Sequence, residues 1–558
     1  MSARRAAPAE VRTRRWPVLV LIPLLIVAAV AVQRHEDDQP VPVSPVPVSS
    51  LMPVAPDAAA PAATWYCAGG TATGTKTGVA EQSVEIANVS DQALTARLTA
   101  VPDVGTPVEK DLPVPAHSRQ SVLVSSLVVA PNASVIVETD GGEIAVSHVL
   151  TGPTGSSTAA CSSSPSASWF FPSGNSEKAT ASHQLLALFN PFPSDAVVSV
   201  TFDTDDGARA PVDFSAIVVP GNKVTVLDVS GAVTLRKEIA TTVTVRSGRI
   251  IADQIQYADG TQDTTKALAV TPGAPQPSPV WWFADGPAGQ GDQTSISVMN
   301  PSDHDVDVEL QVRLDDATNN GQVDPFTFTV PAGRYFVENV TADGRVPLGI
   351  GYTAVAVATD GTPIVADRVT TETTPSVALT VSLGSPATGT RWVVPVASGP
   401  TVTTAVVTVT NPSSTDAVTV TVSSVADGTE TPIPDADQVE IPAGERGAIA
   451  VPIPAGKPLT AVEVVTSAPG VVEALLTFKA AGLAAPLAVP VQGTAQVADS
   501  GLPPSADTSV TLDPNATIDP NATLDPSLDP TLGTGDTTST EPAPTTTSSS
   551  TSTTVATA

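Results

Sequence analysis

The sequence has few aromatic residues for its length. Phe, Trp and Tyr make up only 4% of its 558 residues, while hydrophobic residues as a whole make up 41% and prolines number 54. Val, Ala and Thr therefore carry most of the apolar surface. This composition is typical of many short strands interrupted by turns.

Basic residues are also scarce. The chain has 26 Lys and Arg against 56 Asp and Glu, which gives a net charge of −30. A body this acidic repels phosphate backbones, so we expect no nucleic-acid partner.

No catalytic or metal-binding motif is present. The GxSxG turn of a serine hydrolase and the HExxH helix of a zinc protease are both missing. The five histidines occur at different repeat positions and in no metal-ligand spacing: His35, His117, His148, His183 and His304. We interpret them as surface or internally satisfied side chains. The sequence therefore predicts no enzyme, cofactor or metal, although a catalytic triad built from distant residues stays open.

Two acidic loops occupy the same place in successive repeats. They span residues 203–207 (DTDDG) and 315–321 (DDATNNG). Oxygen-rich loops can hold calcium, but neither loop has the register of an EF-hand with its closing glutamate. Hairpin turns explain Asp, Asn and Gly equally well, so calcium binding stays open.

Cysteine is limited to two residues, Cys67 and Cys161. An isolated pair in an exported chain predicts a disulfide, and closing a loop of about 95 residues would stabilise the fold by about 4 to 5 kcal/mol. Two buried free thiols are the alternative.

One long apolar run is present, at residues 16–33 (WPVLVLIPLLIVAAVAVQ). An arginine-rich segment, residues 1–15, precedes it, so the positive-inside rule predicts a single-pass signal anchor with a cytoplasmic N-terminus. The alternative is a cleaved signal peptide, since Ala29-Val30-Ala31 fits a cleavage site. Both interpretations place the rest of the chain outside the cytoplasm.

Four copies of one β-rich unit fill the middle of the chain. We expect them at residues 64–164, 165–279, 280–390 and 391–497, and we call them the first to fourth repeats. Each carries an early tryptophan, then an asparagine turn, a strictly alternating strand and a Pro-Ala-Gly turn or a variant of it. The tryptophans are Trp65, Trp169, Trp281 or Trp282, and Trp392, and the asparagines are Asn88, Asn190, Asn300 and Asn411. This spacing marks tandem domains of sandwich size.

The fold class that follows is all-β, with tandem immunoglobulin-like sandwiches of seven or eight strands each. A tryptophan that recurs once per repeat at a strand start is expected to fill the core, although exposed rings could stack on sugars. Residues 34–63, rich in Pro and Ala, are expected to form an extended stalk. Residues 498–558, rich in Thr, Ser, Pro and Asp, are expected to be disordered.

The chain resembles a known group of sequences in four features. These are the basic N-terminus, the apolar segment, the Pro-rich spacer and repeats such as WWFADGPAG, VMNPSDHDVDVEL and VPAGRYFVENV. It is an uncharacterised family of exported actinobacterial proteins that carry a domain of unknown function. The resemblance covers residues 1 to about 497 and implies an actinobacterial source and a place in the cell envelope. Its motifs are structural and imply no catalytic residue.

These observations predict a non-catalytic, membrane-anchored scaffold of the cell envelope. Its expected partners are the membrane, through residues 16–33, and an envelope protein or polysaccharide. The alternatives are a carbohydrate-binding array and a hydrolase of envelope polymers with a site between domains.

Overall fold

The computed structural model describes residues 46–74, 78–261, 266–287, 289, 291–316, 321–372, 378–396, 402–426, 428–453, 459, 461–478, 483–484 and 487–499. The expected cytoplasmic segment, the expected anchor and almost all of the expected tail lie outside these residues. Within the described part, no helix is long and apolar enough to cross a membrane. Every described residue belongs to one compact unit, residues 1–503.

Strands dominate the described chain, as the alternating pattern predicts. The first repeat has β1 (Ala63–Cys67), β2 (Glu81–Asn88), β3 (Leu94–Pro102), β4 (Val108–Val114), β5 (Ser118–Leu123), β6 (Ala133–Thr139), β7 (Ile144–Gly152) and β8 (Gly155–Ala160). The second has β9 (Ser168–Phe171), β10 (Ser182–Asn190), β11 (Ala196–Thr204), β12 (Gly207–Arg209), β13 (Ile217–Val219), β14 (Lys223–Asp228), β15 (Ile239–Ser247), β16 (Ile251–Asp259) and β17 (Lys266–Pro272).

The other two repeats follow the same plan. The third has β18 (Val280–Gly286), β19 (Gln293–Met299), β20 (Val306–Leu314), β21 (Phe326–Val330), β22 (Tyr335–Asn339), β23 (Tyr352–Ala358), β24 (Val365–Glu372) and β25 (Ala378–Leu383). The fourth has β26 (Ala387–Pro395), β27 (Val402–Thr410), β28 (Val418–Ala426), β29 (Thr429–Pro432), β30 (Val439–Ile441), β31 (Arg446–Val451), β32 (Ala461–Phe478), β33 (Leu483–Ala484), β34 (Val489–Pro490) and β35 (Ala495–Val497).

Helices are short. The α-helix α2 (Val229–Ala232) is one turn long, and the 3-10 turns are η1 (Val48–Ser50), η2 (Val124–Ser126), η3 (Val212–Phe214), η5 (Val340–Ala342) and η6 (Pro434–Ala436).

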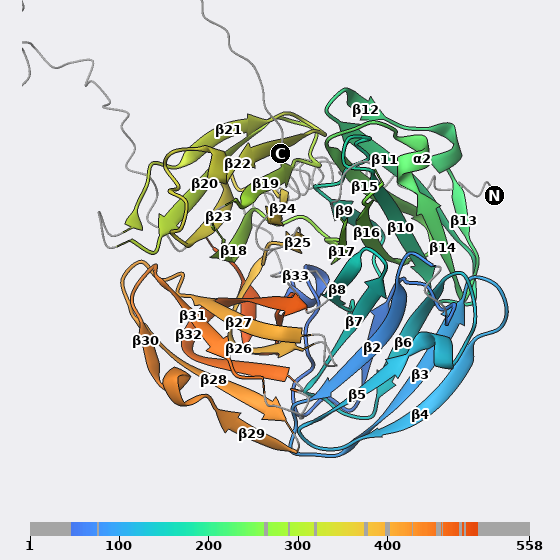
Figure 1. Cartoon of the computed structure of the whole chain (residues 1–558), viewed down its shortest axis with the longest axis horizontal. Coiled ribbons are helices and arrows are strands. Elements are labelled where there is room, and N and C mark those ends of the chain that lie inside the picture. Colours follow the sequence, from blue (N-terminus) through green and yellow to red (C-terminus); the bar gives the residue numbers. More distant parts are fainter. Residues whose placement is uncertain are drawn as a thin grey trace, which may run out of the picture. The chain divides into compact units, whose positions relative to one another are not determined.

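Each repeat is a pair of antiparallel sheets with one common strand order (Figure 1). In the first repeat the sheets are β1-β6-β3-β4 and β5-β2-β7-β8, and in the third they are β18-β23-β20-β21 and β22-β19-β24-β25. The second and fourth repeats depart from this plan, and the fourth has two additional short strands, β34 and β35, beside β26. Their fourth strand is split in two, and in the fourth repeat β32 serves as both the sixth and the seventh strand.

This order confirms an all-β fold but not the immunoglobulin-like part of the prediction. In an immunoglobulin constant domain the first strand pairs with the second. Here the first strand pairs with the sixth, while the second lies between the fifth and the seventh. The alternating pattern fixes which face of a strand is buried, but it contains no information about which strands pair.

The apolar core of each repeat lies between its two sheets and continues into a neighbouring repeat. The core of the second repeat includes Ala68 and Val101 of the first, and the core of the third includes Phe170 and Ala240 of the second. The core of the first repeat includes Val393 and other apolar residues of the fourth. The repeats are therefore packed against one another and are not independent domains joined by linkers.

The recurring tryptophans fill these cores, as expected. Trp65, Trp169, Trp281 and Trp392 are each at most 1% exposed. The indole N–H groups of Trp169 and Trp281 donate to the carbonyls of Ile250 and Ile364, at 3.0 and 2.7 Å. Because these rings are buried, they offer no exposed platform on which a sugar could stack.

The recurring asparagines join two turns that are distant in sequence. In the third repeat the Asn300 amide nitrogen donates to the carbonyls of His304, Val330 and Pro331, at 2.7, 3.0 and 3.2 Å, and its side-chain oxygen accepts from the Ser302 N–H. Equivalent bonds form at Asn88, Asn190 and Asn411. The asparagine thus holds the turn that follows it against the Pro-Ala-Gly turn.

The Pro-Ala-Gly turn has a backbone requirement that explains its composition. Its third residue has a positive φ in every repeat, and the residues there are His117 (47°), Asn222 (51°), Gly333 (64°) and Gly444 (69°). Glycine adopts this left-handed conformation without a steric penalty, and Asn and His tolerate it better than most other residues.

The four repeats contact one another in a closed cycle. β8 contacts β17, β17 contacts β25, β25 contacts β33, and β33 contacts β8. These four strands therefore lie together near the centre of Figure 1. The fourth repeat meets the first, which a linear array would not require.

The described end of the expected stalk is not a free spacer. Leu51, Met52 and Ala55 are at most 2% exposed, and Met52 belongs to the core of the fourth repeat. Ala55 forms a parallel bridge with Val491. Burial of these apolar side chains outweighs the extended preference of their Pro-rich sequence.

The start of the fourth repeat also differs, because β26 begins at Ala387, ahead of the expected residue 391.

Candidate functional site

The two cysteines form the expected disulfide. Cys67 ends β1, and Cys161 directly follows β8, so the bond joins the opening strand of the first repeat to the end of its closing strand. Both residues are buried, at 0% and 1% exposure, which makes the bond part of the core.

The described histidines do not come together. His117 pairs with Asp91 at 2.8 Å, and His304 is exposed beside Asp303 and Asp360. His183 stacks on Tyr257 with 4.7 Å between ring centres. His35 lies outside the described residues. Among the residues that the structure describes, no group of three or more His, Cys, Asp and Glu is arranged to hold a metal ion.

His148 differs from the other described histidines, because it is fully buried between the first and second repeats. Its Nε2 lies 3.6 Å from an oxygen of Asp253 in β16, and its Nδ1 lies 3.2 Å from the Gln82 amide nitrogen. Burial lowers the pKa of His148 to about 4 and raises the pKa of Asp253 to about 7. Near neutral pH the histidine is therefore uncharged, and it supports the interface between the two repeats.

Asp253 belongs to a set of buried or mostly buried carboxylates that recur at these interfaces. In β16, β24 and β32 these carboxylates pair with the residue three positions before the recurring asparagine, and they are Asp253, Asp367 and Glu473, respectively. Each accepts a backbone N–H at or just beyond the end of the first strand of the preceding repeat, from Ala68, Ser173 and Asp285, at 3.1, 3.1 and 3.0 Å. In the first repeat the same place is taken by Ser147.

A second set consists of basic residues that follow the Pro-Ala-Gly turns. One stands shortly after the turn in every repeat: Arg119, Lys223, Arg334 and Arg446. Each reaches back to the preceding repeat in the cycle. Lys223 donates to the carbonyls of Pro102 and Gly105. Arg334 pairs with Asp203 at 2.7 Å.

This second set explains the acidic loops. Asp203 opens the first loop and holds Arg334, while Asp315 opens the second loop and holds Arg446 at 2.7 Å. Residues 317–320 of the second loop lie outside the described residues. The opening carboxylate of each loop therefore already has a cationic partner from the next repeat.

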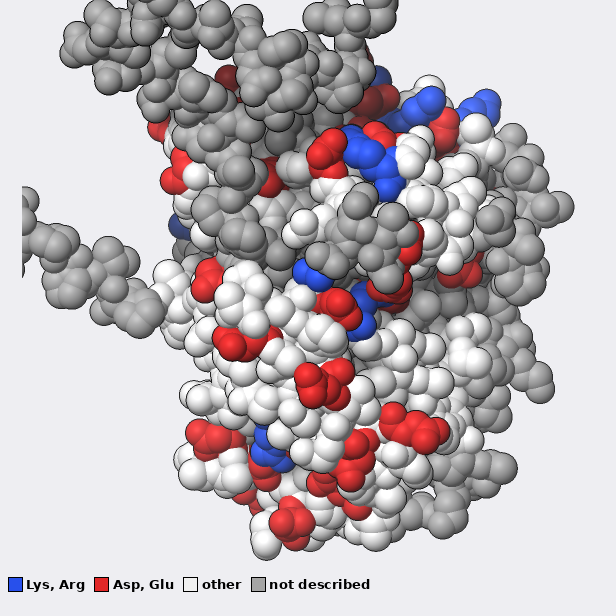
Figure 2. Space-filling view, turned by 90° about the vertical axis from the view of Figure 1, so that its left-hand side faces the viewer, with Lys and Arg blue, Asp and Glu red and all other residues white. Residues whose placement is uncertain are grey.

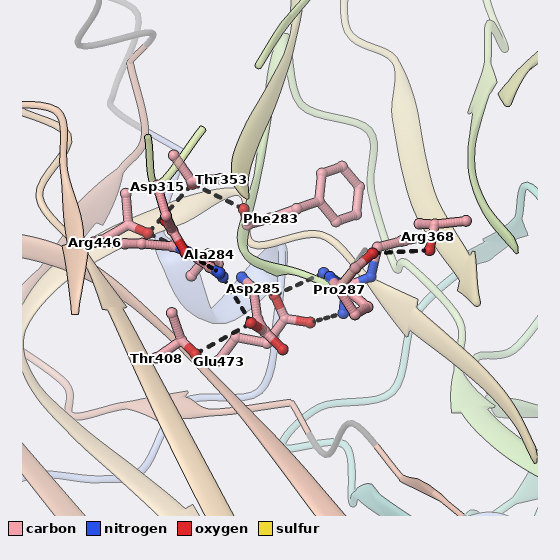
Figure 3. Close-up of polar contacts among 12 residues, drawn as sticks. Phe283, Ala284, Asp285, Pro287, Asp315, Thr353, Arg368, Thr408, Arg446 and Glu473 are labelled. Atoms are coloured by element: carbon pink, nitrogen blue, oxygen red, sulfur yellow. Dashed lines mark hydrogen bonds and ion pairs between the residues drawn. The ribbon is translucent and has the colours of Figure 1, made fainter. Parts of the chain in front are cut away.

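The interface between the third and fourth repeats brings both sets together (Figure 3). The Arg446 guanidinium forms a two-pronged pair with Asp315, at 2.8 and 2.7 Å, and a third bond with Asp285 at 2.7 Å. Asp285 also accepts from the Thr408 hydroxyl at 3.3 Å. Two-pronged Arg–carboxylate pairs fix orientation as well as energy, so this arrangement sets the angle between the two repeats.

Glu473 connects this network to a second arginine. It pairs with Arg368 and accepts the Asp285 N–H. Arg368 is only 2% exposed, and burial raises the pKa of Glu473. A buried ion pair of this kind contributes little net stability, but removing one partner leaves the other charge buried and unpaired, which is strongly destabilising. These charged side chains pair with one another across the interface, so the network joins the third repeat to the fourth.

The interface that closes the cycle is built differently. Arg119 donates to the carbonyls of Val396 and Leu459 in the fourth repeat, at 3.1 and 2.8 Å, and lies 3.4 Å from Glu85 of its own repeat. Arg391 of the fourth repeat pairs with Glu143 of the first and with Glu463. Arginines therefore make the closing contacts on both sides.

Sequence reasoning found the disulfide, the buried tryptophans and the asparagine turns, but it missed both interface sets. A signal for the basic set was present: a basic residue follows each of four turn motifs, in a chain with only 26 Lys and Arg. The buried carboxylates stand in apolar strands, where an acidic residue needs a partner, and that too was a readable signal.

A sequence model of a family of unknown function, DUF5719, matches residues 151–452, more than half of the chain. None of the curated proteins compared with the chain matches its sequence. A solved structure, the crystal structure of Streptomyces avermitilis alpha-L-rhamnosidase complexed with L-rhamnose, matches at 10% identity with a TM-score of 0.12. The match covers 76% of this chain and 55% of that one, so the chain spans about half the length of the rhamnosidase. At this TM-score the likeness supports no argument about fold or function.

Proposed function

The chain belongs to DUF5719, a family of unknown function, and we propose that it is a non-catalytic scaffold of the cell envelope. The observation that carries the proposal is the use of charged side chains at the interfaces between repeats. Arg446, Arg334 and Arg119 all bind the neighbouring repeat. These arginines fix one repeat against another, which supports a structural role.

The proposed location is outside the cytoplasm, with residues 16–33 as the membrane anchor. The Cys67–Cys161 disulfide supports it, because such bonds persist in oxidising compartments. The arginine-rich segment before the apolar run supports the cytoplasmic N-terminus. Secretion after signal-peptide cleavage is the alternative. Carbonate extraction and protease shaving of cells test the two: a membrane-bound, protease-accessible chain supports the anchor, and a soluble form beginning near Val32 contradicts it.

The proposed partner is an envelope protein or a polysaccharide. Figure 2 shows acidic side chains scattered over one face of the molecule, with few basic ones among them. This distribution, together with the net charge of −30, supports the proposal that nucleic acid is not a partner.

A pull-down from envelope extract with the tagged full chain tests the scaffold proposal. We expect the folded chain to retain a specific envelope component, and the heat-unfolded chain to lose it. The purified chain is incubated in parallel with cell-wall polymer. Release of soluble fragments from the polymer would contradict the proposal and favour the hydrolase alternative.

The carbohydrate-binding alternative requires a site other than the repeat-start tryptophans, because Trp281 and Trp282 are at most 3% exposed. The hydrolase alternative requires an acid or base beside a nucleophile. A candidate base is His304, whose Nε2 lies 3.1 Å from the Thr362 hydroxyl oxygen and whose Nδ1 lies 3.2 Å from an oxygen of Asp303. The Thr362 hydroxyl donates to Asp360 at 2.9 Å and the His304 side chain is 55% exposed, so this group lies on the surface rather than in a buried site.

A further inference from the structure

A cavity of about 270 Å³ lies between the second and third repeats. The second repeat contributes the ends of β10 and β16 and the segment after β9, and the third repeat contributes β19, β22, β24 and β25. In Figure 1 these strands lie where the green repeat meets the yellow-green one. The volume is just below the roughly 300–1,000 Å³ that is typical of sites for drug-sized ligands, so the cavity suits a smaller molecule.

The walls of the cavity are rich in groups that both donate and accept hydrogen bonds. They include the hydroxyl-bearing residues Thr180, Ser182, Ser295, Ser297 and Thr371. Apolar side chains from Val337, Val369 and Leu379 line the rest. This mixture matches a molecule with hydroxyl groups on its rim and C–H groups on its faces.

One buried side chain in the wall has an unused donor. Gln256 in β16 is 6% exposed and lines the cavity, and its amide nitrogen has no hydrogen-bond partner. An unpaired buried donor costs about 1 to 3 kcal/mol. A ligand that accepts a hydrogen bond from it would remove that penalty.

The charge of the wall favours a neutral ligand. Lys237 and Glu238 both line the cavity, and their opposite charges balance. The Glu238 carboxylate already accepts from the Tyr335 hydroxyl at 3.1 Å. The wall also contains His183, whose ring stacks on Tyr257.

From these observations we propose that the cavity binds a neutral, hydroxyl-rich molecule of monosaccharide size, with Gln256 donating to one of its oxygens. The site goes beyond the scaffold function. The two proposals can be tested separately, because a scaffold needs no sugar site and a sugar site needs no scaffold.

The test is saturation-transfer NMR and titration calorimetry with the full chain, in a buffer without sugar-headed detergent. The probes are neutral monosaccharides (glucose, galactose, mannose and arabinose), with glucuronic acid and glucosamine as charged counterparts. We expect at least one neutral sugar to bind, and to bind better than its charged counterparts. No binding by any neutral sugar, or preferred binding of a charged one, would overturn the proposal.

Two variants locate the site. Gln256→Leu removes the free donor, and Ser295→Leu adds bulk to the wall from a partly exposed position in β19. We expect each to weaken sugar binding at least tenfold. Ser83→Leu is the matched control, since Ser83 stands at the equivalent strand position in β2, five residues before Asn88, and does not line this cavity.

A thermal melt shows that each variant is folded before it is titrated. If Ser295→Leu folds and binds like the unchanged chain, the sugar does not occupy this cavity and the proposal is wrong. If Gln256→Leu is unfolded, Ser295→Leu alone decides.

Discussion

At the scale of single residues, burial decides what each side chain does. Tryptophan, asparagine and carboxylate side chains recur at fixed places in the repeats, and almost all of them are buried. Burial of an apolar ring stabilises the fold by removing apolar surface from water, whereas a buried polar group without a hydrogen-bond partner destabilises the fold. The residues that the sequence repeats are therefore the ones that the fold needs.

Trp392 tests this at the core of the fourth repeat. Trp392→Ala should destabilise the chain by about 3 to 5 kcal/mol, because the ring leaves a cavity that the surrounding strands cannot fill. Since the core of the first repeat includes residues of the fourth, we expect the first repeat to be weakened as well. Chemical denaturation measures the loss. Val465→Ala in the same repeat is the control, because Val465 is 44% exposed; an equal effect of both changes would show that burial of the tryptophan is not the cause.

Asp367 tests the buried carboxylates through pH. Burial raises its pKa from 3.8 to about 7, while the Ser173 N–H and hydroxyl hold the pKa below what burial alone would give. A pKa that is higher in the folded state gives a contribution to stability that is complete below about pH 4 and is lost as pH rises through 7. At about 1.4 kcal/mol per pKa unit, the loss is roughly 4 kcal/mol.

We therefore expect the chain to melt at a lower temperature at pH 8 than at pH 5, and Asp367→Asn to reduce the difference. The amide keeps an acceptor for Ser173 but does not ionise. Asp307→Asn, at an exposed carboxylate of the same repeat, should leave the difference as it is. A pH dependence that Asp367→Asn does not change would show that Asp367 is ionised at neutral pH.

At the scale of elements, the sequence predicts strands and turns well but not strand order. Val306, Val308 and Leu310 alternate with polar residues and are buried in β20, as the period of two requires. The positive φ at Gly333 and Gly444 explains the turn motif. Pairing of the first strand with the sixth depends on contacts between residues distant in the chain, and nothing in the local pattern encodes them.

The candidate site was less predictable than the fold for a similar reason. Arg446 and Asp315 are 131 residues apart in sequence and meet only because two repeats pack together. Neither residue carries a local motif that names its partner. The burial of Leu51 and Met52 was hidden in the same way, because the surface that covers them belongs to other parts of the chain.

The asparagine turn tests how elements are joined. Asn300→Ala should destabilise the chain by roughly 2 to 4 kcal/mol, because it leaves the Val330 and Pro331 carbonyls without the amide donor. The control is Asn339→Ala, since Asn339 is exposed and only caps the short turn η5. Urea denaturation of the two variants gives the comparison; if they lose equal stability, the bonds between the two turns are not important.

At the scale of the whole molecule, the contacts close four repeats into one cycle. Arg446, Arg334 and Lys223 join successive repeats, and Arg119 joins the first to the fourth. In a linear array each repeat contacts only its sequence neighbours, and its stability is a sum of local terms. Here the fourth repeat also stabilises the first, so the ends of the array should unfold together.

Hydrogen exchange measured by mass spectrometry along a denaturant series tests this closure most directly, because it reports the opening free energy of each repeat separately. The account predicts that strands of the first and fourth repeats share one opening free energy, and that Arg119→Ala lowers it in both. Arg97→Ala is the control, since Arg97 forms an exposed pair with Asp111 inside the first repeat and should change little. If Arg119→Ala lowers protection in the first repeat alone and leaves the fourth as it was, the repeats behave as a linear array and the cycle is contradicted.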